Sequence, residues 1–174
     1  MKKTLILSCA LALAGLSNVA MAADGGQGFV RAELGRSEVD VFGENDNDTA
    51  YSIRGGYFFN ANIGVEGFYS SLYDQNVGTF DTTLTAFGAG VVGKKNFGAD
   101  GNGFFIGGRA GLANYKGEIG SEDETSTHVY AGVGAGYDFS DAFGLSLNYD
   151  FNRPEFDDVD VDADSLTLAG EFRF

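Results

Sequence analysis

The last ten residues of the chain alternate between two kinds of side chain, and this alternation constrains the fold more than any other feature. Counting back from Phe174, every second residue is apolar or small, whereas Arg173, Glu171 and Thr167 occupy positions between them. Successive side chains of a β-strand point to opposite faces of its sheet. We therefore expect a final strand with one apolar face, one face for water or buried charge, and an aromatic end.

The beginning of the chain has the three parts of a secretory signal peptide. A basic start (Met1-Lys2-Lys3) precedes an apolar run at residues 4–16, and Ala20-Met21-Ala22 forms a small-x-small cleavage site. Cys9 ends a lipobox-like segment, but cleavage there would leave only a stub of the apolar run. The sequence therefore predicts a signal peptide at residues 1–22 that is removed, and one domain at residues 23–174.

Charge and cysteine content narrow the classes of partner. The chain has 25 acidic residues against 11 Lys and Arg, and its one cysteine lies within the expected signal peptide. Nucleic-acid binding is excluded because phosphate contacts need basic patches. The mature domain is expected to lack disulfides, and no later apolar run is long enough for a transmembrane helix.

Alternation of apolar and polar residues predicts eight strands. Residues 82–95 are apolar in both phases, so the sequence leaves open which of them face inward. Short and long links alternate between the strands, as in outer-membrane barrels. The predicted fold is all-β, an eight-stranded antiparallel up-and-down transmembrane β-barrel, with strands at 28–41, 49–59, 63–73, 82–95, 104–116, 127–139, 143–151 and 165–174.

A water-soluble barrel of the lipocalin kind is the structural alternative, and it would need its apolar face inside. In this chain the charged set is interleaved with glycine, and the opposite set is large and apolar. Aromatic residues also gather near the strand ends, as at the two interfaces of a membrane. The expected belts are Phe59, Phe104, Phe139, Phe143, Phe172 and Phe174 at one end, and Tyr51, Tyr73, Tyr149 and Phe151 at the other.

The polar phase of the strands places charged residues in the barrel interior, which eight strands make just wide enough for side chains to fill. The first and last strands are neighbours in a closed barrel, so Arg31 is expected to reach Glu171, and Arg54 to reach Glu66. Pairing is expected because an unpaired buried charge is costly. We predict a salt-bridged plug, with a narrow ion path as the alternative. The network is Arg31, Glu33, Arg54, Glu66, Arg109 and Glu171, with Asp138, Asp150 and Arg173 also inward.

The signal peptide, the eight strands and the terminal Phe174 together resemble the small outer-membrane β-barrels of the OmpA/OmpX type, over the whole mature chain. The resemblance implies residence in the outer membrane of a Gram-negative envelope, with its lipids and lipopolysaccharide as partners. It also implies recognition by the barrel assembly machinery through Leu166, Leu168, Gly170, Phe172 and Phe174. No peptidoglycan-binding domain is expected, because no residue follows Phe174.

His128, with Ser126 two residues before it, raises the alternative of a lipid A-modifying enzyme. A nucleophile and a base need a third group that orients them, and the sequence offers no such partner at a set spacing. We therefore expect no enzymatic activity and no cofactor.

Acidic residues dominate the long links. Asp158, Asp160, Asp162 and Asp164 alternate with small apolar residues, which suggests a weak divalent-cation site that bridges to lipopolysaccharide phosphates, with Arg36 beside it. The simpler interpretation, which we favour, is a solvated acidic rim. The expected function is structural or interactive: envelope integrity, or binding of an extracellular ligand or adhesion through these loops.

Overall fold

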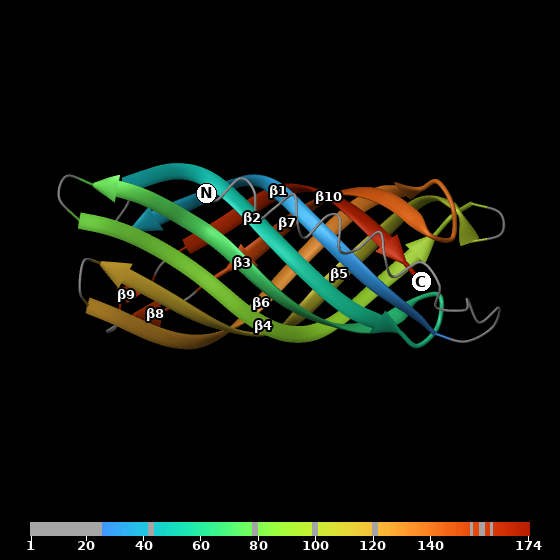
Figure 1. Cartoon of the computed structure of the whole chain (residues 1–174), viewed down its shortest axis with the longest axis horizontal. Coiled ribbons are helices and arrows are strands. Elements are labelled where there is room, and N and C mark those ends of the chain that lie inside the picture. The colour runs from blue at the N-terminus through green and yellow to red at the C-terminus, as the bar shows by residue number, and fades with distance from the viewer. Residues whose placement is uncertain are drawn as a thin grey trace.

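The computed structural model describes residues 26–41, 44–77, 80–98, 101–119, 122–153, 155–156, 159–160 and 162–174. These residues form a closed barrel of long tilted strands (Figure 1). Beside the barrel, β8 (Glu155–Phe156) and β9 (Val159–Asp160) form a small two-stranded sheet. The barrel strands are β1 (Gln27–Val41), β2 (Glu44–Phe58), β3 (Ile63–Val77), β4 (Phe80–Asn96), β5 (Gly103–Ile119), β6 (Glu122–Asp138), β7 (Phe143–Asn152) and β10 (Asp162–Arg173).

Each barrel strand pairs antiparallel with its neighbours, and β1 closes the sheet against β10. Arg31 lies opposite Glu171 in this closing pair, and the backbones of Gly28 and Phe174 exchange two hydrogen bonds of 2.9 Å. The predicted eight-stranded antiparallel up-and-down barrel is therefore confirmed. Among the described residues, no helix has the length and apolar character needed to cross a membrane.

The two faces of the barrel wall differ in the way that the sequence alternation predicts. Leu34, Leu147 and Leu168 point outward with 61%, 53% and 60% of their surface exposed. The residues between them point inward and are buried; Glu33 and Glu171 are only 4% and 5% exposed. Apolar side chains on the outside and buried charges on the inside are the reverse of a lipocalin-like barrel, so that alternative is wrong.

The two ends of the barrel are built differently. The end that carries residues 59–62, 97–98, 101–102 and 139–142, here called the turn end, lies at the right of Figure 1. Its short turns are fixed by side chains: Asn60 Oδ1 accepts hydrogen bonds from the backbone N–H groups of Asn62 and Ile63 at 2.8 and 2.9 Å. Exposed aromatic rings surround this end, among them Phe59, Phe104, Phe139 and Phe143.

The opposite end, here called the loop end, has longer hairpins than expected. β1 and β2 remain paired as far as Val41 and Glu44, and β5 and β6 as far as Ile119 and Glu122. The long links predicted at 42–48 and 117–126 are therefore mostly strand, because backbone pairing continues after the apolar alternation has ended. For residues 39–47, 73–82, 118–124 and 154–162, the side chains lie outside the described part of the chain.

One strand departs from the predicted alternation. The register between β3 and β4 shifts between Ser71 and Tyr73, so that Leu72 is an extra residue and is buried. Beyond the shift, Tyr73 pairs with the inward-facing Leu84. The uninterrupted alternation expected for residues 63–73 is therefore wrong after Ser71. The side chain of Tyr73, assigned to the outer aromatic belt, is not among those described.

Candidate functional site

The candidate site is the barrel interior, where charged side chains from all eight strands meet. Every one of them is at most 8% exposed. The sequence-predicted network contributes Arg31, Glu33, Arg54, Glu66, Arg109 and Glu171. Asp138, Asp150 and Arg173, also expected to point inward, join it, and the structure adds Lys94. Among these described residues, five cations face five carboxylates, so the interior carries no net charge when all are ionised.

Arg109 on β5 is the centre of the middle layer. Its Nη1 donates to Oε1 of Glu33 at 2.6 Å, and its Nε and Nη2 donate to the two carboxylate oxygens of Asp150 at 2.7 and 2.5 Å. The contact with Asp150 is bidentate, the geometry that gives arginine–carboxylate pairs both strength and direction. Arg109 therefore ties β5 to β1 and β7 across the interior.

Arg54 on β2 completes the middle layer from the other side. It donates to Glu33 at 3.1 Å, to Glu66 at 3.0 Å and to Asp150 at 3.3 Å. Its guanidinium also lies 4.4 Å from the ring centre of Phe68, a cation–π contact. The two arginines thus share Glu33 and Asp150, and the middle layer is a connected network instead of a set of isolated pairs.

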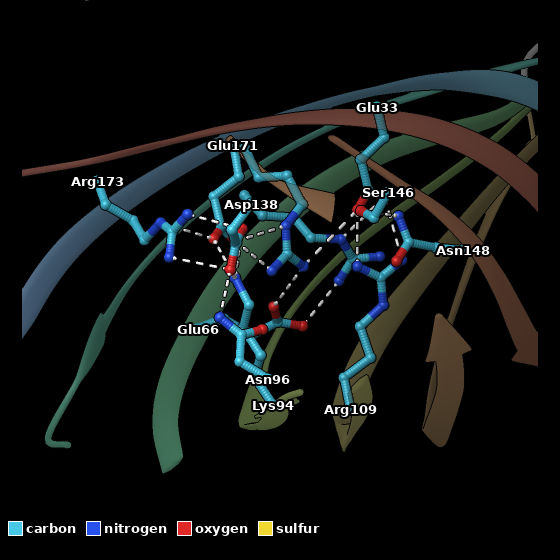
Figure 2. A network of polar contacts seen from close by, with 12 residues as sticks. Glu33, Glu66, Lys94, Asn96, Arg109, Asp138, Ser146, Asn148, Glu171 and Arg173 are labelled. Carbon is cyan, nitrogen blue, oxygen red and sulfur yellow. Dashed lines mark hydrogen bonds and ion pairs between the residues drawn. The ribbon is translucent and has the colours of Figure 1, made fainter. Parts of the chain in front are cut away.

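A second group lies nearer the turn end (Figure 2). It is joined to the first through Arg31, whose Nη1 lies 3.8 Å from Glu66 and 4.0 Å from Glu33. Glu171 accepts from Arg31 at 3.0 and 2.5 Å, and its other oxygen lies 3.4 Å from Nζ of Lys94. Asp138 forms ion pairs with two cations: its Oδ2 lies 2.7 Å from Nζ of Lys94, and its Oδ1 lies 2.7 Å from Nη2 of Arg173. The expected pairs, Arg31 with Glu171 and Arg54 with Glu66, are both brought together, but each belongs to a larger network.

Lys94 was not predicted to lie inside the barrel, because both faces of the strand expected at residues 82–95 are mainly apolar. The signal that could have found it is the pair Lys94-Lys95: adjacent strand residues face opposite sides, so one of these lysines had to lie inside. The structure places Lys94 inside at 8% exposure and Lys95 outside. Lys94 supplies the fifth cation, which the sequence count of four against five lacked.

Two groups of buried apolar and aromatic side chains pack against the ionic network. Toward the loop end, Phe68, Leu72, Tyr115 and Tyr130 are buried together. The Tyr130 hydroxyl donates to Glu66 at 2.9 Å, and the Tyr115 hydroxyl donates to Asn152 at 2.8 Å. Toward the turn end, a smaller apolar group consists of Phe29, Phe58 and Val92.

The inward glycines of β6 provide room for these side chains. A Cβ atom built on Gly132 would lie 2.0 Å from Oδ1 of Asp150, and one on Gly134 would lie 2.3 Å from Oδ1 of Asn148. The absence of a side chain at these two glycines therefore leaves room for Asp150 and Asn148 of the adjacent strand β7. Two small cavities lie among the described interior side chains. They measure about 20 Å³ beside Arg109 and about 10 Å³ beside Asp150, each room for about one water molecule.

His128 and Ser126 do not form a catalytic arrangement in the described part of the chain. His128 lies on β6 opposite Ala113 and is half-buried. No hydrogen bond joins its ring to another described side chain, so no group is in place to orient it as a base.

The predicted divalent site falls mostly outside the described residues. Asp158 is not described, and only the backbone of Asp160 and of Asp162 is. Asp164 points outward and accepts a hydrogen bond from the Tyr149 hydroxyl at 2.8 Å. Among the side chains that the structure describes, no three histidine, cysteine or carboxylate groups gather as a metal site would require.

The residues of the expected assembly signal line the outer face of β10. Leu166 and Leu168 are 49% and 60% exposed, and Phe172 and Phe174 stack with ring centres 6.3 Å apart. Gly170 lies between the two pairs in the same phase. The structure thus presents one continuous apolar edge from the middle of the barrel to the turn end.

Known structures share this architecture. Neisserial surface protein A is 18% identical and matches 84% of this chain and 97% of its own, with a TM-score of 0.69. Ail of Yersinia pestis, solved with the heparin analogue sucrose octasulfate, is 20% identical. The match covers 86% of this chain and 99% of Ail, with a TM-score of 0.61. OprG of Pseudomonas aeruginosa is 15% identical. The match covers 87% of this chain and 97% of OprG, with a TM-score of 0.57. These likenesses show the fold.

No curated protein sequence matches the chain. The family model described as "Outer membrane protein beta-barrel domain" matches residues 7–174, which include every barrel strand. An apolar outer wall, a polar interior and short turns at one end are the features that such barrels need in a bilayer. The chain belongs to the outer membrane protein beta-barrel domain family and is a transmembrane barrel of the outer membrane.

Proposed function

We propose that this protein is a non-enzymatic structural barrel whose lumen is shut by the ionic network, and that its loops act at the cell surface. The observation that carries the proposal is the balance of five buried cations with five buried carboxylates, with buried apolar groups packed against them. An ion path would need a continuous column of water. The described interior instead leaves cavities of about 20 and 10 Å³.

The energetics favour a closed plug over a gate. Opening a path requires several ion pairs to separate in a region of low dielectric constant, and each separated charge loses both its partner and its hydrogen bonds. Arg109 alone contacts two carboxylates with separations of 2.5 to 2.7 Å. The network therefore acts as a packed core made of polar groups.

Planar-bilayer conductance of the refolded mature chain tests the closed lumen. We expect no steady channels from the wild-type protein. A matched control is Arg36→Gln, which changes an exposed outward arginine and leaves the interior intact. Steady wild-type channels that disappear with a neutral residue at Arg109, and persist in the Arg36 variant, would overturn the plug and support the narrow pore.

The proposed surface role rests on the charge of the loop end. The long links predicted from the sequence for this end contain thirteen acidic residues: Glu44, Asp46, Asp48, Glu118, Glu122, Asp123, Glu124, Glu155, Asp157, Asp158, Asp160, Asp162 and Asp164. Ail was solved with a sulfated ligand, which is a polyanion. The acidic rim here repels polyanions, so we propose that the loops select basic or neutral partners, or simply keep the surface solvated.

A deletion strain separates the two parts of this role. We expect loss of the protein to raise detergent sensitivity if it supports envelope integrity, and to lower adhesion if the loops bind a surface. Complementation with a chain whose acids at 155–164 are neutralised should restore detergent resistance but not adhesion. Restoration of both by that chain would show that the acidic rim binds nothing needed for adhesion.

We also propose how the protein is exported and assembled into the outer membrane. Residues 1–22 direct export and are removed, and the outward edge of β10 that ends at Phe174 is recognised by the barrel assembly machinery. Deletion of Phe174 should then lower the amount of folded barrel in the outer membrane. Refolding of the purified chain into vesicles, which needs no machinery, should be affected much less.

A further inference from the structure

The described outer wall of the barrel carries a concavity with a charged rim. It measures about 510 Å³ and lies at the turn end, against β4, β5 and the turn between β2 and β3. Its floor is backbone, because Gly93 and Gly108 pair across the two strands and bring no side chains. Ile106 forms an apolar side of it, and Asn62 and Lys95 form the polar rim. The concavity is shallow and open on its outer side, so an occupant would lie along the wall and not be enclosed by it.

Lys95 is unusual among its neighbours. In the turn half of the barrel, the described outward-facing residues of the strands include no other lysine or arginine and no carboxylate. Lys95 is exposed, and no hydrogen bond or ion pair joins it to another described residue. The adjacent Lys94 points into the barrel instead, where it forms an ion pair with Asp138. A cation on a lipid-facing wall must reach a polar partner at the interface.

The surroundings fit one kind of occupant. Exposed Phe97 and Phe104 flank the site on β4 and β5, and such aromatic side chains mark the headgroup level of a membrane. The concavity therefore has its cation at headgroup depth and its apolar glycine floor farther along the strands, toward the middle of the membrane. A glycerophospholipid has the complementary arrangement, with a phosphate at one end and acyl chains at the other.

Short turns of outer-membrane barrels lie on the periplasmic side, so the concavity at the turn end faces the periplasmic leaflet. We infer that it binds an anionic glycerophospholipid of that leaflet, with its phosphate on Lys95 and Asn62 and an acyl chain over Gly93 and Gly108. The net negative charge of the headgroup decides the preference, because a zwitterionic headgroup carries its own cation beside the phosphate. The site involves only the outer wall and does not depend on whether the lumen conducts.

The chain has no tryptophan, so single-tryptophan variants can report on contact with brominated lipids, which quench tryptophan fluorescence. Phe104→Trp places the reporter beside the concavity. Phe143→Trp places the control at the same end on β7, three strands away from β4 in the barrel order. Both variants are refolded into phosphatidylcholine vesicles that contain increasing fractions of dibrominated phosphatidylglycerol or dibrominated phosphatidylcholine. Heat-modifiable gel migration verifies folding.

At the Phe104→Trp reporter we expect dibrominated phosphatidylglycerol to be preferred about fivefold, the effect of one basic residue near a membrane surface. No such preference is expected at Phe143→Trp, and Lys95→Gln should abolish it at Phe104→Trp. Gly108→Val, whose added Cβ meets nothing closer than 3.6 Å, fills the floor and should weaken quenching by both lipids.

Two results would overturn the inference. Equal preference at the two reporters would mean that anionic lipid is merely enriched around the whole barrel. An unchanged preference in Lys95→Gln would remove the phosphate contact. If Lys95→Gln acts as expected but Gly108→Val has no effect, the acyl-chain part of the assignment is wrong.

Discussion

The inward and outward faces of the same strands differ in what their side chains need for stability. On β10, Leu166 and Leu168 face outward with about half of their surface exposed, while Thr167 and Glu171 face inward and are almost fully buried. The outer face needs only apolar surface, because lipid neither donates nor accepts hydrogen bonds. The inner face needs partners for every charge. Each outward position can therefore be predicted from its own residue type, whereas an inward charge can be interpreted only together with its partner.

The most destructive way to break the inner face is to remove its central cation. Arg109→Leu leaves Glu33 and Asp150 with Arg54 as their remaining contact in the middle layer, and we expect a loss of about 3–5 kcal/mol in unfolding free energy. Urea unfolding in lipid vesicles, followed by circular dichroism, measures it. Arg109→Lys keeps the charge and should lose less; equal losses would mean that geometry matters more than charge.

The outer face can be broken at Leu168, whose neighbours in the sheet are Leu34 and Leu147. Leu168→Arg puts a charge against lipid near the middle of the strand and should destabilise the barrel by about 2–4 kcal/mol in the same assay. Leu168→Ala is the control for lost apolar area alone. A Leu168→Arg variant as stable as Leu168→Ala would contradict a lipid-facing position.

The adjacent lysines give the sharpest comparison of the two faces. Lys94→Met removes a buried cation from Asp138 and Glu171, and should cost about 1.5–3 kcal/mol. Lys95→Met changes an exposed residue and should alter stability by no more than about 0.5 kcal/mol. Reversal of this order in urea unfolding would show that β4 has the other phase.

A smaller effect is expected where the inner face contains a neutral pair. Tyr115→Phe removes the hydroxyl that donates to Asn152 at 2.8 Å, with little change in shape. The expected loss is about 0.5–1.5 kcal/mol. Tyr137→Phe, on the outward face of β6, serves as a control and should be close to neutral. A larger loss for Tyr137 would refute the assignment of the two faces.

The smallest effect is expected at the loop end. If the acidic rim is only solvated, calorimetry with Ca²⁺ should give the same small heats for the wild type and for the double variant Asp160→Asn, Asp162→Asn. A binding isotherm seen only in the wild type would instead establish the divalent site suggested by the alternating aspartates.

The sequence was sufficient for the architecture because each strand alternates independently of the others. It was also sufficient to suggest that Arg31 lies near Glu171, since barrel closure makes their strands neighbours. It failed at Leu72, because a single inserted residue leaves no mark on the composition of a strand. It left Lys94 unassigned, since β4 is apolar on both faces, and the sharing of Glu33 between two arginines depends on how far side chains reach across the interior.

The extent of the strands was also beyond the sequence. The expected second strand begins at residue 49, but β2 begins at Glu44 and remains paired with β1 throughout. Polar, acidic residues are poor indicators of a strand, and here backbone pairing extends the hairpin past the apolar wall.

Water access to the lumen is the most direct test of the closed, charge-balanced interior. The only cysteine of the chain, Cys9, lies in the expected signal peptide, so the mature protein can carry one engineered thiol. Ser146→Cys places it inside, at a position only 6% exposed, and Ser140→Cys places it on an exposed turn. We predict that a charged, water-soluble thiol reagent modifies the folded Ser140→Cys protein rapidly and leaves Ser146→Cys unmodified. Equal rates of modification at the two positions would contradict a closed lumen.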